Sequence, residues 1–173
     1  HISVHHTNEI AQSEGAYETP LARVWMHAEF LLIDESKMAK SAGNFFTLQS
    51  LTEKGFNPLA FRYLALTAHY RSKLNFTWES LAGSDQSLER LKTFAIEIRN
   101  AKKTSSRTSL RPWKDAFIKA ISDDLNTPQA LATLWDLVNV CRRSPGRYDP
   151  RTILAFLYEC DRVLGLGLKE AKD

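Results

Sequence analysis

The chain has 173 residues, of which 43% are hydrophobic and 25% are charged. This composition is typical of a globular protein and excludes a disordered, collagen-like or disulfide-scaffold chain. The 23 basic and 20 acidic residues give a net charge of +3, which permits a nucleic-acid partner without indicating one. A chain of this length predicts one domain or two small ones.

The two cysteines, Cys141 and Cys160, form no C-x-x-C pair, so the sequence contains neither a zinc knuckle nor a thioredoxin-type motif. Two thiols without a disulfide framework favour a reducing compartment. Apolar runs such as residues 30–33 are far shorter than the roughly 18 residues of a membrane helix, and residues 1–15 contain no signal-peptide core. The chain begins with His rather than Met, which indicates a processed chain or a fragment. We therefore expect a cytoplasmic protein without a membrane segment.

The first part of the chain predicts one short helix and one strand. Residues 4–14 form a helical pattern, with Ser3 as N-cap and Gly15 as the end. The compact apolar run at residues 28–33 predicts a strand, because polar residues follow it at once. Residues 34–46 then predict a loop.

Two further short helices are expected before residue 71. Thr47 caps a helix over residues 48–54, which Gly55 ends. Pro58 opens the next helix, which runs to about Tyr70.

The rest of the chain predicts a helical bundle. Apolar residues recur at helical spacing over residues 79–99, 128–142 and 150–164. Two of these helices begin alike, because Thr127 and Asp149 each place a capping residue before a proline. Short helices with short links and one apolar face each predict an antiparallel bundle.

A basic linker over residues 99–114 holds six basic and no acidic residues. A solvated loop explains such a run. The alternative is a strip that contacts the phosphates of a nucleic acid, with Lys102, Lys103 and Arg107 as the candidate contacts.

Three polar segments carry candidate chemistry, and the first lies at the N-terminus. His5 and Glu9 are four residues apart, so on a helix they share a face. An imidazole and a carboxylate placed in this way can both bind zinc. The spacing alone is weak, because such pairs are common on solvent-facing helices, and a purification tag is a second, less favoured explanation.

The second segment is Lys37–Asn44. Two lysines, Lys37 and Lys40, lie three apart in a loop of small residues. Their ammonium groups can neutralise charge that develops on a departing polyphosphate, and small residues allow the loop to open and close. The alternative is a charged surface loop.

The third segment, His69–Phe76, predicts a polar, basic corner between two helices. By itself it is typical of a helix C-terminus, at which Arg71 and Lys73 complement the helix dipole.

In combination these segments resemble the class I cysteinyl-tRNA synthetases. Each of four stretches is similar to a family signature: His5–Glu14 to HHxNEIAQSE, Lys37–Ser41 to KMSKS with Ala39 for its first Ser, His69–Asn75 to HYRSxLN, and Asp123–Pro128 to DDxNTP. The resemblance spans residues 1–168. Four matches in the right order are far more specific than any one of them.

The resemblance implies one zinc ion, held by two Cys, one His and one Glu, which binds the substrate thiolate and so selects cysteine over serine. The His and Glu carry over to His5 and Glu9. The two Cys belong upstream of residue 1, so the zinc site is incomplete here. Cys141 and Cys160 match no ligand and are expected to be core thiols.

The resemblance also implies an ATP site in which Lys40 contacts ATP and Lys37 assists the loop, with Met38 and Ser41 beside them. Ala39 is expected to shift the loop only modestly. Arg71, together with His69, braces the active site or lies near the acceptor end of the tRNA.

The fold that the resemblance implies is mainly α: a remnant of a Rossmann-type catalytic domain, with a short strand plus helices, followed by an antiparallel helical bundle. The expected division is a catalytic part over residues 1–50, a helical connector over residues 51–78 and a DALR-like bundle over residues 79–173. The HIGH signature of the family is absent, and an anticodon-binding domain would follow residue 168.

We therefore expect part of a ligase that activates cysteine with ATP and transfers it to tRNA(Cys). The isolated chain is expected to be inactive, and the full-length enzyme a monomer. One alternative is the related ligase that joins cysteine to a glucosamine–inositol in mycothiol synthesis. Another is a non-catalytic tRNA-binding module.

Overall fold

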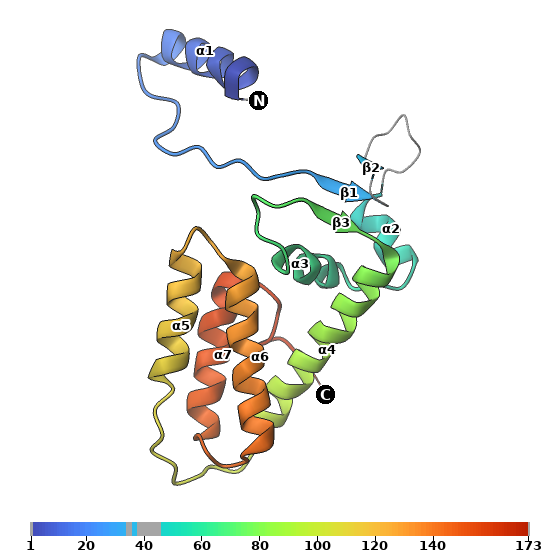
Figure 1. The fold of residues 1–173 in the computed structure, drawn as a ribbon, viewed down its shortest axis with the longest axis vertical. Coiled ribbons are helices and arrows are strands. Elements are labelled where there is room, and N and C mark those ends of the chain that lie inside the picture. The colour runs from blue at the N-terminus through green and yellow to red at the C-terminus, as the bar shows by residue number, and fades with distance from the viewer. Residues whose placement is uncertain (1, 34–35, 38–45, 173) are drawn as a thin grey trace.

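The computed structural model describes residues 2–33, 36–37 and 46–172 (Figure 1). In chain order the elements are η1 (Ile2–His6), α1 (Thr7–Tyr17), β1 (Leu31–Ile33), β2 (Ser36–Lys37), α2 (Leu48–Glu53), α3 (Pro58–Leu66), β3 (Leu74–Phe76), α4 (Trp78–Asn100), α5 (Arg111–Ser122), α6 (Thr127–Arg143) and α7 (Pro150–Leu164). The described part is mainly helical, with a small sheet, which confirms the expected fold class. No helix within it is long and apolar enough to cross a membrane.

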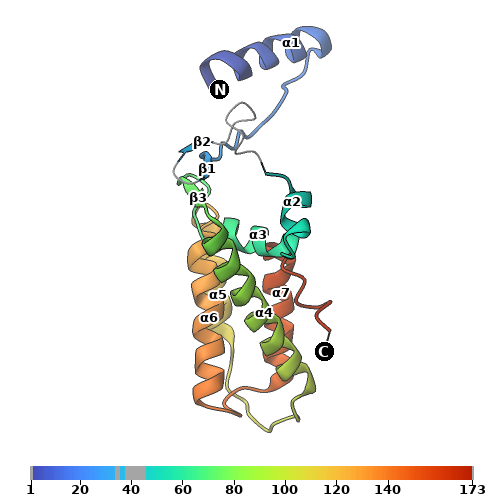
Figure 2. The ribbon, with the colours of Figure 1, turned by 90° about the vertical axis from the view of Figure 1, so that its right-hand side faces the viewer.

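Helix α1 lies apart from the rest of the chain, and an extended segment joins it to the sheet (Figures 1 and 2). It buries no residue. The predicted N-cap at Ser3 and the predicted end at Gly15 were both wrong: Ser3 lies inside a π-helical turn, and the helix continues to Tyr17. A glycine in an exposed helix costs about 1 kcal/mol relative to alanine but does not by itself end the helix. The end comes just before Pro20, which disfavours helical conformation at the residue that precedes it.

The sheet has three strands in the order β2-β1-β3. β1 pairs with β2 antiparallel and with β3 parallel, so that Leu31 faces Leu74 and Ile33 faces Phe76. The predicted strand over residues 28–33 keeps only its last three residues. β3 was not predicted, because the corner over residues 69–76 offered only a short apolar alternation as a signal.

Helices α2 and α3 connect the two parallel strands. Thr47 caps α2 as predicted, and its side chain and that of Ser50 satisfy each other's backbone N–H groups. The side chain of Asn57 caps α3 in front of Pro58. The prediction that α3 reaches Tyr70 was wrong: it ends at Leu66, and the chain turns there to enter β3.

Four helices, α4 to α7, run alternately down and up to form the bundle (Figures 1 and 2). The three predicted bundle helices are confirmed to within two residues at each end. α5 was not predicted, and it includes the last four residues of the predicted linker. Asp149 caps α7 as expected, but Asn126 rather than Thr127 caps α6.

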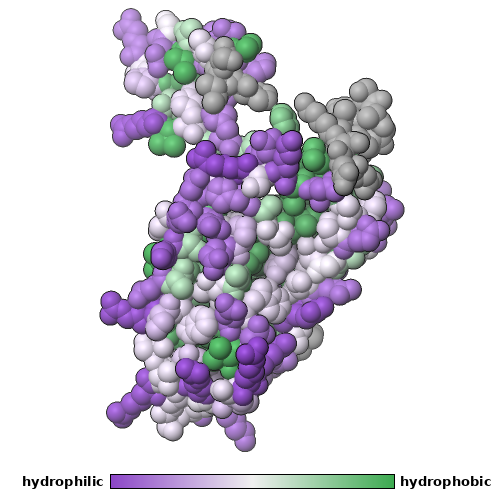
Figure 3. Space-filling view, viewed as in Figure 1, coloured by the Kyte–Doolittle hydropathy of each residue, from purple (hydrophilic) through white to green (hydrophobic). Residues whose placement is uncertain are grey.

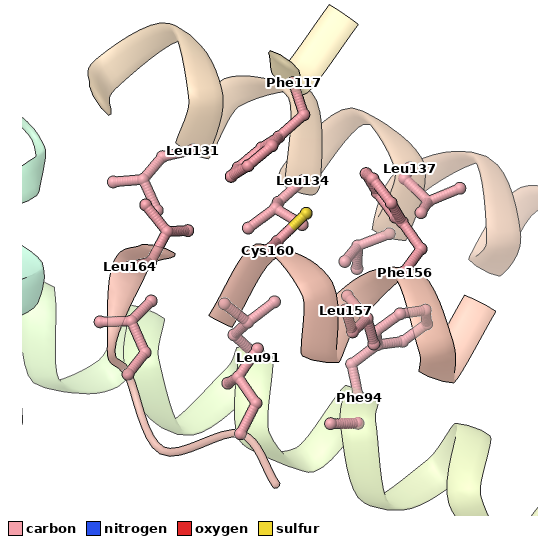
Figure 4. Packing of buried hydrophobic residues seen from close by; sticks show 14 of the residues in the cluster. Leu91, Phe94, Phe117, Leu131, Leu134, Leu137, Phe156, Leu157, Cys160 and Leu164 are labelled. Carbon is pink, nitrogen blue, oxygen red and sulfur yellow. The ribbon is translucent and has the colours of Figure 1, made fainter. Parts of the chain in front are cut away.

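Two apolar cores hold these elements together. The sheet-side core consists of Ile33, Leu51, Ala60, Leu64, Phe76 and Leu81. The bundle core is larger, and Figure 4 shows side chains of α4, α5, α6 and α7 meeting in it. Its fully buried leucines, each stabilising by about 2 kcal/mol, include Leu91, Leu134 and Leu157.

Helix α3 belongs to both cores. Ala60 and Leu64 pack into the sheet-side core, whereas Tyr63 packs into the bundle core. The indole Nε1 of Trp135, on α6, donates a hydrogen bond to the Tyr63 hydroxyl at 2.7 Å. Helix α4 also reaches both cores, because Leu81 lies in the sheet-side core and Leu91 in the bundle core, so α3 and α4 together join the sheet to the bundle.

Shortening Leu157 to alanine tests the bundle core, because this side chain is 0% exposed. We expect Leu157→Ala to lower the free energy of unfolding by about 2–5 kcal/mol, through lost burial and an unfilled cavity. Val163→Ala, on the same helix but with 53% of its surface exposed, is the matched control and should change stability by less than about 0.5 kcal/mol. Urea unfolding of the three proteins measures both effects, and equal losses would contradict this packing.

Candidate functional site

The candidate zinc ligands lie at the start of the chain, His5 in η1 and Glu9 in the first turn of α1. Both residues are exposed. The Glu9 carboxylate accepts a hydrogen bond from Nδ1 of His6 at 2.8 Å, a contact that the sequence analysis missed. His6 therefore holds the Glu9 carboxylate, whereas His5 is the residue that is expected to bind zinc together with Glu9.

His6 also connects this segment to the chain that leads into β1. Its ring lies 4.5 Å from that of Trp25 and 4.9 Å from that of His27, centroid to centroid. Nε2 of His27 is enclosed and has no hydrogen-bond partner among the described residues. The N-terminal turn therefore packs on the Trp-Met-His segment that the sequence places just before β1.

The donors at His5 and Glu9 fit zinc in chemistry, because neutral imidazole nitrogen and carboxylate oxygen are both common zinc ligands. The described ranges contain no group of three or more His, Cys, Asp or Glu side chains that could hold a metal ion. Two donors do not by themselves complete a tetrahedral site.

The lysine motif begins at the edge of the sheet. Lys37 lies in β2, and its Cα pairs with that of Leu32 in β1. Met38, Ala39, Lys40 and Ser41 lie outside the described residues. A cavity of about 150 Å³ lies beside the sheet, lined by apolar side chains that include Leu31, Ile33, Phe46 and Phe76. It is too small and too apolar to hold a nucleotide.

A polar cluster of four residues, here called the Asp124 clamp, joins the corner before β3 to the turn between α5 and α6. Its members are His69, Tyr70, Arg71 and Asp124. The Tyr70 hydroxyl donates to Oδ1 of Asp124, and Nε of Arg71 donates to Oδ2, both at 2.6 Å. Nε2 of His69 lies 3.9 Å from the same Oδ2 atom, and the Arg71 guanidinium lies over the Tyr70 ring. Two family-like segments 54 residues apart thus meet in one cluster.

Arg71 therefore does not serve as the dipole-complementing residue that the sequence predicted. Helix α3 ends at Leu66, before Arg71, and the guanidinium pairs with Asp124 instead. The backbone of the same corner also supports β1, because the Tyr70 carbonyl accepts a hydrogen bond from Glu29 N–H at 2.7 Å. The corner thus braces both the entrance to the sheet and the bundle.

The polar groups of the Asp124 clamp change one another's pKa. Hydrogen bonds from Arg71 and Tyr70 lower the pKa of the Asp124 carboxyl, and the bond to that carboxylate raises the pKa of the Tyr70 hydroxyl. Asp124 adopts a left-handed backbone conformation with φ of 52°. Asp and Asn tolerate this region better than most residues, so the turn favours a short polar side chain here.

The predicted basic linker is shorter than expected. It spans residues 101–110, because its first two residues end α4 and its last four begin α5. Lys102, Lys103 and Arg107 are all exposed on it. Arg99 has a structural role, since its guanidinium donates to the carbonyl of Ala171 at 2.8 Å and so holds the C-terminal segment.

The two cysteines are free thiols, as expected for core residues. Cys160 is buried in the bundle core, and Cys141 packs against its edge. Burial raises the pKa of Cys141 to about 11 and also raises that of Cys160. Both groups remain protonated at neutral pH, which disfavours nucleophilic or metal-binding roles.

Comparison with known proteins gives one consistent result. Residues 2–86 match the family described as tRNA synthetases class I (C) catalytic domain, and residues 116–169 match the DALR domain. Cysteine–tRNA ligase 1 of Burkholderia lata is 47% identical over 98% of this chain and 34% of its own length. The cysteine–tRNA ligases of Chlamydia trachomatis serovar D and Treponema denticola are 38% and 37% identical, over 95% and 98% of this chain and 39% and 38% of their own lengths. The chain spans little more than a third of these relatives.

Replacing Asp124 by asparagine tests the clamp without disturbing its backbone, because Asn also tolerates a positive φ. A lowered folded-state pKa stabilises the protein above the ordinary carboxyl pKa, and this stabilisation is lost as pH falls through the lowered value. We expect Asp124→Asn to be less stable than the parent at pH 7, with the difference vanishing under acid.

Thermal unfolding between pH 7 and pH 2 measures this difference. Asp136→Asn, on the exposed face of α6, is the control and should follow the parent at every pH. A gap between Asp124→Asn and the parent that does not depend on pH would contradict the ion pair.

Proposed function

Because the chain belongs to the cysteinyl-tRNA synthetase family, we propose that it is part of a cysteine–tRNA ligase, an enzyme that activates cysteine with ATP and transfers it to tRNA(Cys). The observation that carries the proposal is the match to cysteine–tRNA ligases along nearly the whole chain, across a catalytic-domain segment and a DALR segment. The lysine motif lies inside the catalytic-domain segment, and a protein that only bound tRNA would have no use for it.

In this proposal the lysine motif binds ATP. Lys40 contacts the polyphosphate and Lys37 assists, with Met38 and Ser41 beside them. Two ammonium groups stabilise the negative charge that develops as pyrophosphate leaves. Support comes from the position of Lys37 on the outer strand of the sheet, at which a loop can reach a ligand beyond the sheet edge.

His5 and Glu9 are the proposed zinc ligands of this chain. When bound, zinc would take the cysteine thiolate and favour it over the harder hydroxyl of serine. The Glu9 carboxylate has a second oxygen, so it could bind the metal and still accept the hydrogen bond from His6, whose ring packs on Trp25 and His27. The hydrogen bond from His6 would thus orient the Glu9 carboxylate for the metal.

Contact with tRNA is proposed for Arg71 near the acceptor end and for Lys102, Lys103 and Arg107 in the linker. We also retain the division at residues 1–50, 51–78 and 79–173, which the capping of α4 by Thr77 supports. The proposed location of the enzyme is the cytoplasm, because its two free thiols would stay reduced there. The full-length enzyme is proposed to act as a monomer.

The first test is cysteine-dependent exchange between ATP and pyrophosphate. The 173 residues alone, supplied with zinc, should show no exchange above background, because they contain neither the HIGH signature nor two of the four zinc ligands. A hybrid in which this chain replaces the matched segment of Burkholderia lata cysteine–tRNA ligase 1 should show clear exchange.

In the same hybrid, Lys40→Ala should lower the exchange rate by about 100-fold, because it removes one group that stabilises the developing charge. Lys119→Ala, an exposed lysine of α5, is the matched control and should leave the rate unchanged. Exchange by the chain alone, or a hybrid with Lys40→Ala that is as fast as the control, would contradict the proposed site.

A further inference from the structure

The Asp124 clamp joins the bundle to the corner before β3 at a point where packing is incomplete. The corner, residues 67–73, and the turn between α5 and α6 meet at the end of the bundle nearest the sheet, which strongly hydrophilic side chains cover in Figure 3. Beside this meeting point lies a hollow of about 500 Å³, with Tyr70, Leu125 and Met26 in its lining. The hydrogen bonds to Asp124 therefore do much of the work of holding the two segments together.

The turn that carries Asp124 adopts a costly conformation. Asp124 and Leu125 both have a left-handed backbone, with φ of 52° and 56°. One left-handed residue, usually glycine, is enough to end a helix, and a side chain makes each such residue unfavourable. Leu125 is 42% exposed, so burial of its side chain does not account for the turn. Strain of this kind persists where other contacts determine the conformation, and here those contacts are the bonds from Arg71 and Tyr70 to Asp124.

The clamp reaches the sheet through the backbone of the corner. Tyr70 donates to Asp124 through its hydroxyl and accepts from Glu29 N–H through its carbonyl at 2.7 Å. One residue thus joins the α5–α6 turn to the chain that enters β1. A further backbone bond, from Leu74 N–H to the Phe30 carbonyl at 3.4 Å, follows along the same two segments. The corner therefore fixes β1 at its N-terminal end.

Strand β1 in turn supports the start of the lysine motif. It lies between β3 and β2, and Leu32 pairs with Lys37. β1 has three residues and β2 has two, so their ladder contains few hydrogen bonds and is weakly held by itself. A shift at the entrance of β1 is therefore passed on to β2, and a group that binds a ligand beyond β2 is displaced with it.

Stability alone is a weak reason for this clamp. The Arg71 side chain is 65% exposed and the Asp124 side chain 48% exposed, and ion pairs with such exposure add little to the free energy of unfolding. Orientation requires only that one geometry is preferred over others. Arg71 and Tyr70 bind different oxygens of the same carboxylate, so the geometry of the corner is fixed at two points.

We propose that Asp124 is a positioning residue for the lysine motif: through Tyr70 and Arg71 it fixes the corner that holds the entrance of β1, and β1 holds the strand that carries Lys37. This inference rests on the proposed function, because it takes the lysine motif as the element that binds ATP. It adds to that function a residue of the bundle, which lies 87 positions beyond Lys37 in the sequence.

The first test measures amide hydrogen exchange of the 173-residue chain by NMR. Asp124→Asn should speed hydrogen exchange of the Glu29 amide by about 10-fold, because its bond to the Tyr70 carbonyl then opens more often. The increase should be larger at Glu29 than at Leu157, whose buried position makes its amide a reporter of global unfolding. Asp123→Asn, the same change at the exposed residue before, is the matched control and should leave the Glu29 amide as in the parent.

The second test measures cysteine-dependent ATP–pyrophosphate exchange in the hybrid, a reaction that needs no tRNA. Asp124→Asn should raise the KM for ATP by about 10-fold and leave the KM for cysteine unchanged, because a displaced lysine motif binds ATP less well. An unfolded fraction of the enzyme would instead lower the apparent kcat and leave both KM values unchanged. Arg71→Gln should have the same effect, and the double variant should be no worse than either single variant, because the two side chains act as a pair.

The inference would be overturned by an unchanged Glu29 amide in Asp124→Asn, or by a KM for ATP that is the same in Asp124→Asn as in Asp123→Asn. A parent hybrid with normal ATP–pyrophosphate exchange, together with unchanged KM values in the variants, would overturn this inference alone. A hybrid without that activity, together with faster hydrogen exchange at Glu29, would overturn the ligase proposal and leave the link between the clamp and β1 supported.

Discussion

The structure depends on the two helices that reach both apolar cores, α3 and α4, and the shorter of them, α3, is buried on two sides. Ala60 and Leu64 of α3 fill the core beneath the sheet, while Tyr63 enters the bundle core and accepts the hydrogen bond of Trp135. This bond joins a half-buried indole to a buried phenol and contributes about 0.5–1.5 kcal/mol, so it favours one arrangement of the two parts. The sheet edge that carries Lys37 is thereby held in place relative to the bundle.

This arrangement places different chemistry at the two ends of the bundle. The Asp124 clamp lies at the end next to the sheet, where it ties Arg71 to the α5–α6 turn. The exposed cations Lys102, Arg142 and Arg147 lie at the other end, and α6, with 17 residues, spans about 26 Å between the two ends.

Local signals predicted the fold well wherever a cap and an apolar face agreed, as at Thr47, Asp149 and Pro150. They failed where tertiary contacts decide the outcome. β3 exists because β1 lies beside it, and α5 begins at Arg111, after Leu110, which provides no side-chain cap. Most of the candidate site came from the family resemblance, because no periodicity distinguishes His5 from any exposed histidine. The contacts of Asp124 join residues more than 50 positions apart and have no local signal.

The central claim is that this chain supplies the lysine motif, two zinc ligands and the bundle of a cysteine–tRNA ligase. Attachment of radiolabelled cysteine to tRNA(Cys) by the hybrid enzyme tests it most directly, with radiolabelled serine as the competing substrate. The account predicts charging with cysteine, little charging with serine, and loss of cysteine charging when His5 and Glu9 are changed to alanine. A folded hybrid that charges neither amino acid, or that is indifferent to His5 and Glu9, would contradict it.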